Sequence, residues 1–360
     1  MACAWVHGQI ERVDAFATPC VTPQRPETPI ATRAPATMRA AVRHRYGPPE
    51  SVTVTDARTP TPGDDEVLVR VHAASLNFGD VFLLGGRPRL FRLAGFGLLR
   101  PKIRILGGDI AGVVAAVGTG VVGVTVGDGV IGDVNFCGWG GLAQYVTVPP
   151  SLLVRKPAAI SFVEGAAMPI AGVTALQAVD AAHVQPGDRV LVNGASGGVG
   201  TFALQIARAR GAEVTAVCSA RNVAQAQALG AAAVVDYTRQ DFRTAGARYD
   251  AIVDVATKRS IVPALACVRP GGRYVVVGGG LRCLAQANLW GRWLSWRHGV
   301  TVTGVTHRRS RDDLQRLRDL LASGDVVSAI DRTYALEHVR EALAYVQTGR
   351  ARAKVVVTVP

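Results

Sequence analysis

The chain has 360 residues, of which 49% are hydrophobic and 19% are charged, and its formal net charge is +13. This composition is typical of a well-packed globular protein and excludes a largely disordered chain, while no apolar run reaches the roughly 18 residues of a membrane span. The six cysteines form no CxxC pair, which disfavours a zinc knuckle or a disulfide scaffold and predicts a reducing, cytoplasmic setting. The basic residues are scattered and not interleaved with aromatic residues, so we do not expect nucleic acid as a partner.

The first 37 residues differ from the rest of the chain. Residues 1–37 contain five prolines and no periodic apolar pattern, which predicts a disordered extension. A strand pattern opens at Met38, and from there to residue 160 short β-branched segments are separated by glycine and proline. Regular short strands of this kind predict an all-β unit. The clearest candidates are Ser51–Thr55, Glu66–Ala73, Ala111–Val117 and Leu142–Val148.

Between residues 161 and 306 strand candidates alternate with helical segments, which predicts βαβ units and a doubly wound parallel sheet. The fold class is therefore α/β, with a second, all-β domain. Residues 307–360 begin with a charged helix and end with a strand that is too isolated to extend the parallel sheet. We therefore expect this segment to complete the first domain. The predicted strands are Arg189–Asn193, Glu213–Cys218, Ala233–Val235, Ala251–Val255, Arg273–Val277, Val300–Val305 and Lys354–Val359, with one more near Ala329, and the C-terminal helices are Arg311–Ala322 and Glu337–Val346.

A glycine-rich turn between the strand 189–193 and a helix-forming segment gives the most specific local signal. Gly197 would let the backbone approach a pyrophosphate, and Gly200 would let the helix pack closely on the strand. The N-terminus of this helix would attract the phosphate groups. Ala195 stands where the G-x-G-x-x-G fingerprint has its first glycine, so a purely structural tight turn stays open as an alternative. As a dinucleotide site, the turn would bind its cofactor through Ser196, Gly197, Gly198, Val199 and Gly200.

The end of the next strand indicates which dinucleotide is bound. An NAD site usually places Asp or Glu there, but this sequence continues Ser219-Ala-Arg221-Asn222 after the strand. Ser219 can donate a hydrogen bond to a 2′-phosphate and Arg221 can pair with its charge, which favours NADP(H) over NAD. An exposed arginine at a helix start remains the alternative interpretation of Arg221.

Several separated segments together resemble the medium-chain dehydrogenase/reductase superfamily, on its zinc-free quinone oxidoreductase-like branch. The resemblance covers residues 38–360 and implies a GroES-like domain of residues 38–160, completed by 307–360, and a Rossmann domain of residues 161–306. It also implies a homodimer. The segments are Ala73–Asp80, Leu106–Gly118, Gly140–Val146, Ala166–Ala175, the glycine turn and Gly349–Val356.

The same resemblance implies roles for residues outside the glycine turn. Tyr237 matches a position near the adenosine phosphate, and Thr174 lies in the segment that lines the nicotinamide. Asn77 lies in the loop that faces the nicotinamide, and Gly278 ends the strand whose backbone passes the cofactor. Lys354 matches the lysine of the closing G-K-V-V pattern, in which Ala353 replaces the glycine.

The metal ligands of zinc-dependent relatives are missing from this sequence. Asn77 and the run Gly107-Gly108-Asp109 stand where ligands would be expected, and only Cys137 lies in the lobe that would hold a structural zinc. We therefore expect no metal, and we interpret His44 and His72 as core or surface residues. Without a Lewis acid the hydride acceptor must be reactive by itself, as quinones and α,β-unsaturated carbonyls are.

Polar groups beside the substrate oxygen would stabilise the charge that develops there, and Asn77 and Asp80 are the candidates. A helix cap is the alternative role of Asp80. The segments Leu84–Arg104 and Leu281–His298 are candidates to shape substrate choice. In the second, Trp290, Trp293 and Trp296 at helical spacing favour core or dimer interface over a substrate pocket.

The sequence thus predicts an NADPH-dependent reductase of quinones or enones. Two other classes of function stay open. One is a zinc-free alcohol dehydrogenase. The other is a nucleotide-sensing or nucleic-acid-binding protein on a reductase fold, which the net charge motivates.

Overall fold

The computed structural model describes residues 34–86, 92, 96–135, 137–244, 246–257, 260–277 and 281–360, without the side chains of residues 281, 282 and 284. These residues belong to one compact unit, Ala31–Pro360. Residues 1–33, which are most of the predicted extension, lie outside the described residues, and the first strand begins at Thr37. No helix among the residues described is both long and apolar enough to cross a bilayer.

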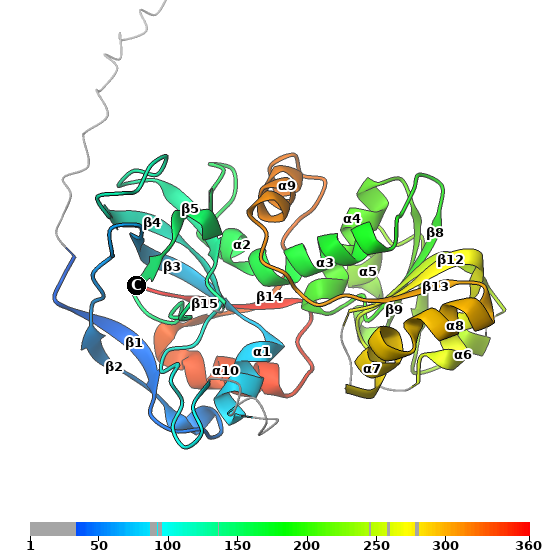
Figure 1. The fold of residues 1–360 in the computed structure, drawn as a ribbon, viewed down its shortest axis with the longest axis horizontal. Helices are drawn as coiled ribbons and strands as arrows, with labels where there is room; N and C mark the ends of the chain where they lie inside the picture. The colour runs from blue at the N-terminus through cyan, green and yellow to red at the C-terminus, as the bar shows by residue number, and fades with distance from the viewer. Residues whose placement is uncertain are drawn as a thin grey trace, which may run out of the picture. The chain divides into compact units, whose positions relative to one another are not determined.

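The strands of the N-terminal half form a seven-stranded sheet that the C-terminal strand joins (Figure 1). Its order is β14-β15-β3-β4-β5-β7, and β6 also pairs with β3. Strand β15 runs antiparallel to β3, with Val357 opposite Ala74, and parallel to β14. A separate antiparallel pair consists of β1 and β2. The bounds are β1 (Thr37–Arg43), β2 (Val52–Arg58), β3 (Val67–Leu76), β4 (Asp109–Val117), β5 (Gly129–Asp133), β6 (Tyr145–Val148), β7 (Leu153–Arg155), β14 (Ile330–Ala335) and β15 (Lys354–Thr358).

A core of valines and leucines fills this domain because alternate residues of its strands point to one face. Val67, Val69 and Val71 of β3 are buried in one apolar cluster with Leu343 and Val346. The last two belong to α10, so the C-terminal helix as well as the C-terminal strand packs into the first domain. The helices of this part are α1 (Phe78–Gly85), α2 (Phe162–Ala167) and α10 (Val339–Gln347).

The second sheet has six parallel strands in the order β10-β9-β8-β11-β12-β13. The order reverses between β8 and β11, which is the position where doubly wound sheets bind their ligands. The predicted combination of an all-β domain and a doubly wound α/β domain is therefore confirmed. The strands are β8 (Arg189–Asn193), β9 (Glu213–Cys218), β10 (Ala233–Asp236), β11 (Tyr249–Asp254), β12 (Val268–Val276) and β13 (Thr301–Gly304).

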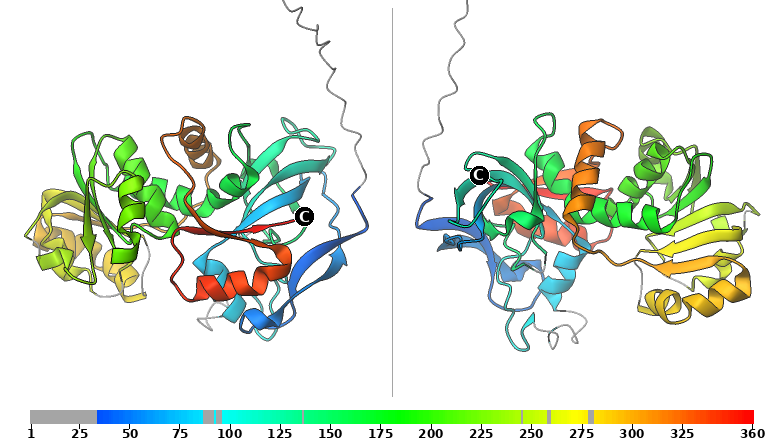
Figure 2. Two further views of the ribbon diagram at one scale, coloured as in Figure 1. Left: turned by 180° about the vertical axis from the view of Figure 1, so that it is seen from behind. Right: turned by 45° about the horizontal axis from the view of Figure 1, so that its top comes forward.

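Helices cover both faces of the six-stranded sheet, as both views in Figure 2 show. One apolar cluster joins Val190 and Val192 of β8 to α3, α4 and α5, and a second joins Leu191 of the same strand to α6, α7 and α8. This alternation explains why the strands read as continuous apolar runs in the sequence. The helices are α3 (Pro169–Ala181), α4 (Gly198–Ala209), α5 (Val223–Ala228), α6 (Val262–Leu265), α7 (Leu281–Leu289) and α8 (Gly291–His298).

Helix α9 (Arg311–Ala322) has the bounds that its sequence predicts. Its N-cap Ser310 accepts a hydrogen bond from the Asp313 N–H. Leu314 and Leu317 are buried in the cluster that contains α3, and a side chain at Gly172 of α3 would collide with Leu317. The helix therefore packs against α3, although it lies in the segment that returns to the first domain.

Two predicted strand starts are wrong by three or more residues. The predicted strand 142–148 begins only at Tyr145, because residues before it run beside β1, where the Leu142 carbonyl accepts from the Ala41 N–H. Strand β12 begins at Val268, five residues before the predicted start at Arg273. Its first residues include Gly271, which has a φ of 78°.

Candidate active site

The glycine turn joins β8 to α4 and leaves open space for a ligand. A side chain at Gly200 would collide with the Gly194 carbonyl oxygen, so this glycine is required for close packing of helix and strand. At Gly197 the nearest atom that a Cβ would meet is the same carbonyl oxygen, at 3.6 Å, which is an ordinary contact. No described protein neighbour therefore requires glycine at position 197. Its small size leaves room above the α4 N-terminus, where phosphate groups bind in such folds.

Asn222 connects the glycine turn to the end of β9. Its amide Nδ2 donates to Ser196 Oγ (2.9 Å) and to Ser219 Oγ (3.3 Å). The adjacent Arg221 is exposed and donates to the Arg350 carbonyl oxygen at 2.9 Å. Ser196 and Ser219 are thus brought together through Asn222, whereas the Arg221 side chain extends to Arg350. Sequence reasoning missed Asn222, because an asparagine after a strand is also an ordinary turn residue.

A carboxylate from the neighbouring strand lies close to this group. Asp236 ends β10, and its Oδ1 accepts from both N–H and Oγ1 of Thr238, at 3.0 and 2.8 Å. These hydrogen bonds lower the pKa of Asp236 below its ordinary value. Tyr237 follows it and is 62% exposed, so its ring is available to a ligand.

A cavity of about 370 Å³ opens at the carboxyl ends of β8, β9 and β11, where the strand order reverses. Gly194 and Tyr237 line it at one end and Asp254 and Tyr274 at the other. Asp254 accepts from Asn193 Nδ2 (2.8 Å) and from the Tyr274 hydroxyl. Burial is the main cause that raises the pKa of this phenol well above its ordinary value. Asp254 and Tyr274 thus form part of the cavity wall, and their polar groups are hydrogen-bonded to protein partners.

A buried ionic cluster lies at the junction between the first domain and the glycine turn. Lys354 Nζ donates to Asn77 Oδ1 (2.6 Å), Asp109 Oδ2 (3.2 Å) and the Leu76 carbonyl oxygen (3.3 Å). A side chain at Gly198 would lie 3.0 Å from Lys354 Cδ, so the lysine stem packs beneath the turn. Because a lysine has three N–H donors, this ammonium is fully bonded to protein acceptors.

Asp109 is the centre of this cluster. Its Oδ2 also accepts from Ser75 Oγ (2.7 Å) and Asn77 Nδ2 (2.8 Å), and its Oδ1 accepts from the Ile170 N–H (2.9 Å). The carboxylate thereby joins β3, β4 and the start of α3. Asn77 is held by both ends of its amide, which fixes the loop that the sequence placed beside the nicotinamide.

Asp80 is buried in the first turn of α1 and caps that helix. Its carboxylate accepts from the N–H of Asn77 (2.8 Å) and from the N–H of Gly107 (3.1 Å). Burial raises the pKa of Asp80 to about 6, although the two backbone donors oppose this shift. The helix-cap interpretation, which the sequence left open, therefore describes its contacts.

An apolar cavity of about 270 Å³ adjoins Asn77 and Asp80. It opens beside aromatic and aliphatic side chains of the first domain and one imidazole from the segment after β13. Such a cavity fits a flat, mainly apolar molecule that carries few polar groups. Its walls include Tyr46, Phe82, Phe96, Asn135, Trp139, Ile170 and His307.

His307 connects the two domains through a hydrogen-bonded chain. Its Nδ1 lies 3.1 Å from Thr174 Oγ1, and its Nε2 lies 2.7 Å from Asp133 Oδ2. Thr174 belongs to α3 and also donates to the Ile170 carbonyl oxygen at 2.6 Å. Sequence reasoning found Thr174 but missed His307 and Asp133, because a lone histidine before two arginines resembles a surface residue.

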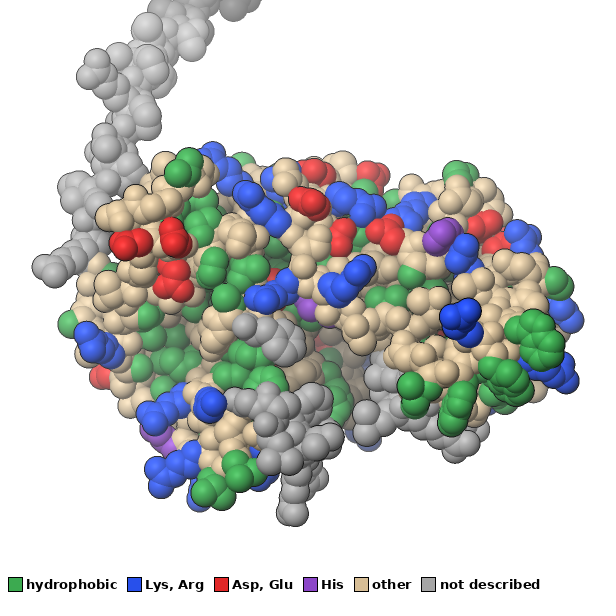
Figure 3. Space-filling view, in the orientation of Figure 1, with side chains coloured by type: hydrophobic (Ala, Val, Ile, Leu, Met, Phe, Trp, Pro, Cys, Tyr) green, Lys and Arg blue, Asp and Glu red, His purple; other side chains and the backbone are tan. Residues whose placement is uncertain are grey.

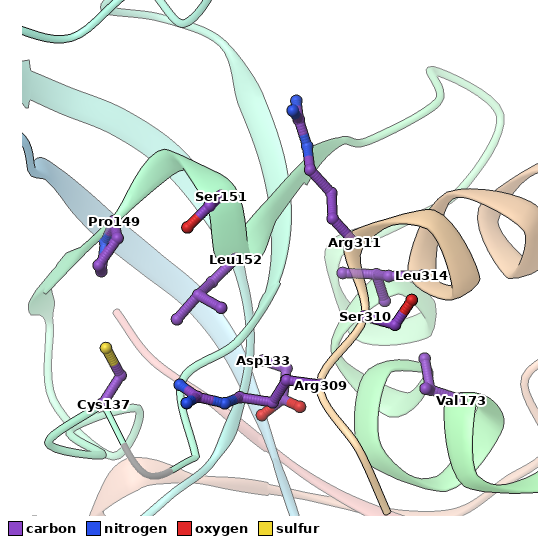
Figure 4. A pocket seen from close by; sticks show the side chains of 10 residues that line it. All are labelled: Asp133, Cys137, Pro149, Ser151, Leu152, Val173, Arg309, Ser310, Arg311 and Leu314. Carbon is purple, nitrogen blue, oxygen red and sulfur yellow. The ribbon is translucent and has the colours of Figure 1, made fainter. Parts of the chain in front are cut away.

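Asp133 also borders a second cavity, of about 520 Å³, on the far side of this chain (Figure 4). The guanidinium of Arg309 extends into that cavity beside Asp133, and Cys137 lies at its other end. The hydrogen-bonded chain therefore reaches from the apolar cavity at His307 to a more open, basic cavity at Asp133.

The donor set does not fit a zinc ion. Within the described ranges, no group of three His, Cys, Asp or Glu side chains converges as metal ligands would. Asn77 and Asp109 occupy the expected ligand segments and are bonded to Lys354. His72 stacks on Phe162 with ring centroids 4.4 Å apart, and burial lowers the pKa of this imidazole.

Two further sequence expectations concern positions away from these cavities. Gly278 lies outside the described residues. Trp290, Trp293 and Trp296 are 57%, 59% and 80% exposed, so the expectation that they belong to the core of the chain is wrong. Figure 3 shows hydrophobic side chains gathered over α7 and α8, where this tryptophan face lies.

Two family models match the chain. Residues 63–158 match the alcohol dehydrogenase GroES-like domain, and residues 229–357 match the zinc-binding dehydrogenase domain. Together with the two-domain fold and the glycine turn, these matches define a nicotinamide-dependent oxidoreductase. The chain belongs to the medium-chain dehydrogenase/reductase family, which confirms the resemblance inferred from its sequence.

Named relatives lie within the same family. The chain is 30% identical over 342 residues to 2-methylene-furan-3-one reductase of Solanum lycopersicum, covering 92% of this chain and 81% of the relative. It is also 30% identical to the chloroplast envelope quinone oxidoreductase homolog of Arabidopsis thaliana, with 83% and 91% covered. The solved quinone oxidoreductase from Coxiella burnetii superposes with a TM-score of 0.81 at 30% identity, covering 90% of this chain and all of that one.

Proposed function

We propose that this oxidoreductase transfers hydride from NADPH to a quinone or an α,β-unsaturated carbonyl, without a metal ion. The observation that carries the proposal is the apolar cavity beside Asn77 and His307, whose walls suit a flat, electron-poor acceptor. The names of the similar reductases support the same substrate class.

The protein's contribution is to bind, orient and shield the reactants, because the bound NADPH supplies the hydride itself. The glycine turn and the α4 N-terminus would bind the pyrophosphate, and Thr174 would lie beside the nicotinamide. The cluster of Lys354, Asn77 and Asp109 holds the loop that separates this position from the substrate cavity. Aromatic walls exclude water, which favours hydride transfer between fixed partners.

The preference for NADPH rests on the group at the end of β9. Ser219 and Arg221 would bind the 2′-phosphate, and the exposed Arg350 lies against Arg221. Removing a guanidinium that pairs with phosphate should cost NADPH more binding free energy than NADH, which lacks that phosphate. Tyr237 would pack beside the adenosine. Lys354 and Gly278 complete the proposed cofactor contacts. Lys354 is included because its side chain packs beneath the glycine turn.

We also propose a homodimer of this chain, located in the cytoplasm. Strand β13 is an edge of the six-stranded sheet, and α8 with its exposed tryptophan face precedes it directly. A second copy would cover both features. Among the described cysteines, Cys137, Cys218 and Cys267 are free thiols, as a reducing compartment favours. The domain division at residues 160 and 306 is part of the same proposal.

The experiment is a spectrophotometric assay of NADPH and NADH oxidation with a panel of quinones and enones, with and without a metal chelator. We expect chelator-insensitive turnover that is faster with NADPH, and we expect Arg221→Ala to raise the KM for NADPH at least tenfold with little effect on NADH. Arg239→Ala, an exposed arginine that follows the neighbouring strand β10, is the matched control.

Three results would change the proposal. Loss of activity with the chelator would support a metal enzyme, and metal-independent oxidation of simple alcohols would support the zinc-free alcohol dehydrogenase. Binding of NADPH without turnover of any acceptor, together with salt-dependent binding of nucleic acid, would support a sensing or nucleic-acid-binding protein.

A further inference from the structure

We propose that Asp133, His307 and Thr174 form a proton relay that supplies the proton taken up by the substrate after hydride transfer. This inference rests on the proposed function, because that reaction consumes one proton from the medium for each NADPH. The relay gives a role to His307 and Asp133, which the proposed cofactor contacts do not use.

The three side chains come from elements far apart in the sequence and are held in fixed contact. Thr174 lies in the second turn of α3, Asp133 ends β5, and His307 follows β13. The His307 side chain is 15% exposed and that of Asp133 is 8% exposed. Asp133 Oδ1 accepts from the Asn135 N–H at 3.0 Å, which leaves Oδ2 for the imidazole. An imidazole fixed at both nitrogens has the arrangement of a proton-transfer group.

The polar groups of Asp80 and Tyr46 in the apolar cavity are committed to backbone contacts. Both carboxylate oxygens of Asp80 accept backbone N–H groups. The Tyr46 hydroxyl donates to the carbonyl oxygens of Phe96 and Gly97, at 2.8 Å each. Arg92 stacks on the Tyr46 ring, and a guanidinium does not release protons near neutral pH. His307, by contrast, lines this cavity and has hydrogen-bond contacts with two other side chains, Thr174 and Asp133.

The proton balance of the step is complete. Hydride from NADPH forms a new C–H bond on an enone, or reduces a quinone, and the electron pair of the acceptor moves to its oxygen. The step requires the Thr174 hydroxyl, which is 3.1 Å from the cavity-lining His307, to turn from the Ile170 carbonyl to this oxygen and give it a proton. His307 Nδ1–H replaces the proton on Thr174, and the neutral imidazole keeps its Nε2–H on Asp133. Water returns a proton to the imidazole after the product leaves.

Charged groups of both signs lie around His307. The Asp133 carboxylate is in direct contact and stabilises an imidazolium. Arg308 and Arg309 follow in the chain and oppose it, but the Arg309 guanidinium extends into the outer cavity (Figure 4). Across the apolar cavity, Asp80 and Arg92 carry opposite charges.

The test compares variants that keep or remove each step of the relay. Thr174→Ser keeps the hydroxyl, whereas Thr174→Val removes it at nearly the same volume. His307→Gln and Asp133→Asn keep polar side chains but cannot transfer the same proton. The measurements are kcat with 1,4-naphthoquinone at saturating NADPH, its pH profile, its solvent deuterium isotope effect, and the isotope effect of NADPH deuterated at the transferred position.

We expect Thr174→Ser to stay within about threefold of the wild type, and Thr174→Val and His307→Gln to lose about 100-fold or more in kcat, the usual contribution of a positioned acid. The alkaline fall of kcat should disappear in His307→Gln. In both impaired variants the solvent isotope effect should rise and the hydride isotope effect should fall, because proton transfer becomes limiting. In His307→Gln, which changes none of the proposed cofactor contacts, the dissociation constant for NADPH, measured by fluorescence, should change less than about threefold.

Two results would overturn the relay while leaving the proposed function intact. One is wild-type kcat and solvent isotope effects in Thr174→Val and His307→Gln. The other is a loss explained by weaker NADPH binding or a lower melting temperature with unchanged isotope effects, which indicates that His307 only ties the domains together. If the wild-type protein oxidises NADPH with none of the quinones or enones tested, the proposed function is overturned, and the relay with it.

Discussion

The ammonium of Lys354 lies 3.2 Å from the carboxylate of Asp109, and solvent reaches only 3% of the first side chain and none of the second. The pair joins the start of β15 to the start of β4. Because both charges are withdrawn from water, each depends on the other and on the neutral groups around them.

Removal of either charge should therefore destabilise the protein strongly. We expect Lys354→Met and Asp109→Asn each to lower the free energy of unfolding by about 3–5 kcal/mol, the usual cost of an uncompensated buried charge. Asp109→Asn should be the more severe change, because the buried Lys354 ammonium then has only neutral acceptors. In Lys354→Met the Asp109 carboxylate still accepts from three donors. Urea denaturation followed by circular dichroism measures both values.

The exposed pair of Arg39 and Asp56 provides the control, since its side chains are far more accessible and its contact is 3.4 Å. Asp56→Asn should change the free energy of unfolding by less than about 1 kcal/mol. Equal, small effects of the buried and exposed substitutions would contradict a coupled buried pair.

Arg43 is almost fully buried and should be a second determinant of stability. Its guanidinium donates to the Ile103 carbonyl oxygen (3.0 Å) and to the Leu83 carbonyl oxygen, and burial lowers the pKa of this group to about 10. Arg43→Ala leaves both carbonyls without this donor and should cost about 3 kcal/mol or more. Thermal unfolding checks this value against the exposed neighbour Arg45→Ala, which should change it by less than about 0.5 kcal/mol.

Asp80 should make stability depend on pH in an unusual direction. Its pKa is about 6 in the folded protein and about 3.9 in an unfolded chain, so the folded state binds its proton more tightly. The contribution of Asp80 to the free energy of unfolding therefore falls as pH rises from about 4 to about 6, by about 3 kcal/mol, and is constant above that range. Denaturation of the wild type and Asp80→Asn at pH 4, 5, 6 and 7 should show the two curves diverging toward low pH. Parallel curves would show that Asp80 titrates normally.

The exposed tryptophan face should control the oligomeric state. Trp293 and Trp296 expose large apolar area next to the edge strand β13, which is the area that a second copy would bury. We expect Trp293→Ser/Trp296→Ser to convert a dimer into a monomer in multi-angle light scattering. Val122→Ser, an exposed apolar position in the first domain, should leave the dimer unchanged. A monomeric wild type, or a dimeric double variant, would exclude this face as the interface.

Much of the fold follows from local sequence patterns. The six parallel strands are recognisable because each is a short apolar run followed by a helix or turn, and α9 is recognisable because its cap and its buried leucines repeat at helical spacing. The glycine turn can also be recognised from the sequence, because the contact between Gly200 and Gly194 is local in the chain.

The remaining features depend on contacts between distant segments. Arg43 occupies a strand pattern in which an arginine normally faces solvent, and only the loop near Ile103 buries it. His307 and Asp133 are 174 positions apart, so their contact leaves no local signal. For Asp80, the sequence offered both catalysis and capping, and the backbone N–H of Gly107, from a different segment, completes the cap.

The place of β15 between β14 and β3 has a consequence for the order of folding. Its lysine contacts residues up to 278 positions earlier, so β3 is synthesised long before its neighbour in the sheet. The six-stranded sheet, by contrast, is built from one continuous stretch and depends on shorter loops. During synthesis the nucleotide-binding domain can therefore fold first. Until β15 is made, the edge of β3 that it will cover stays unpaired, where chaperones can bind it or aggregation can begin.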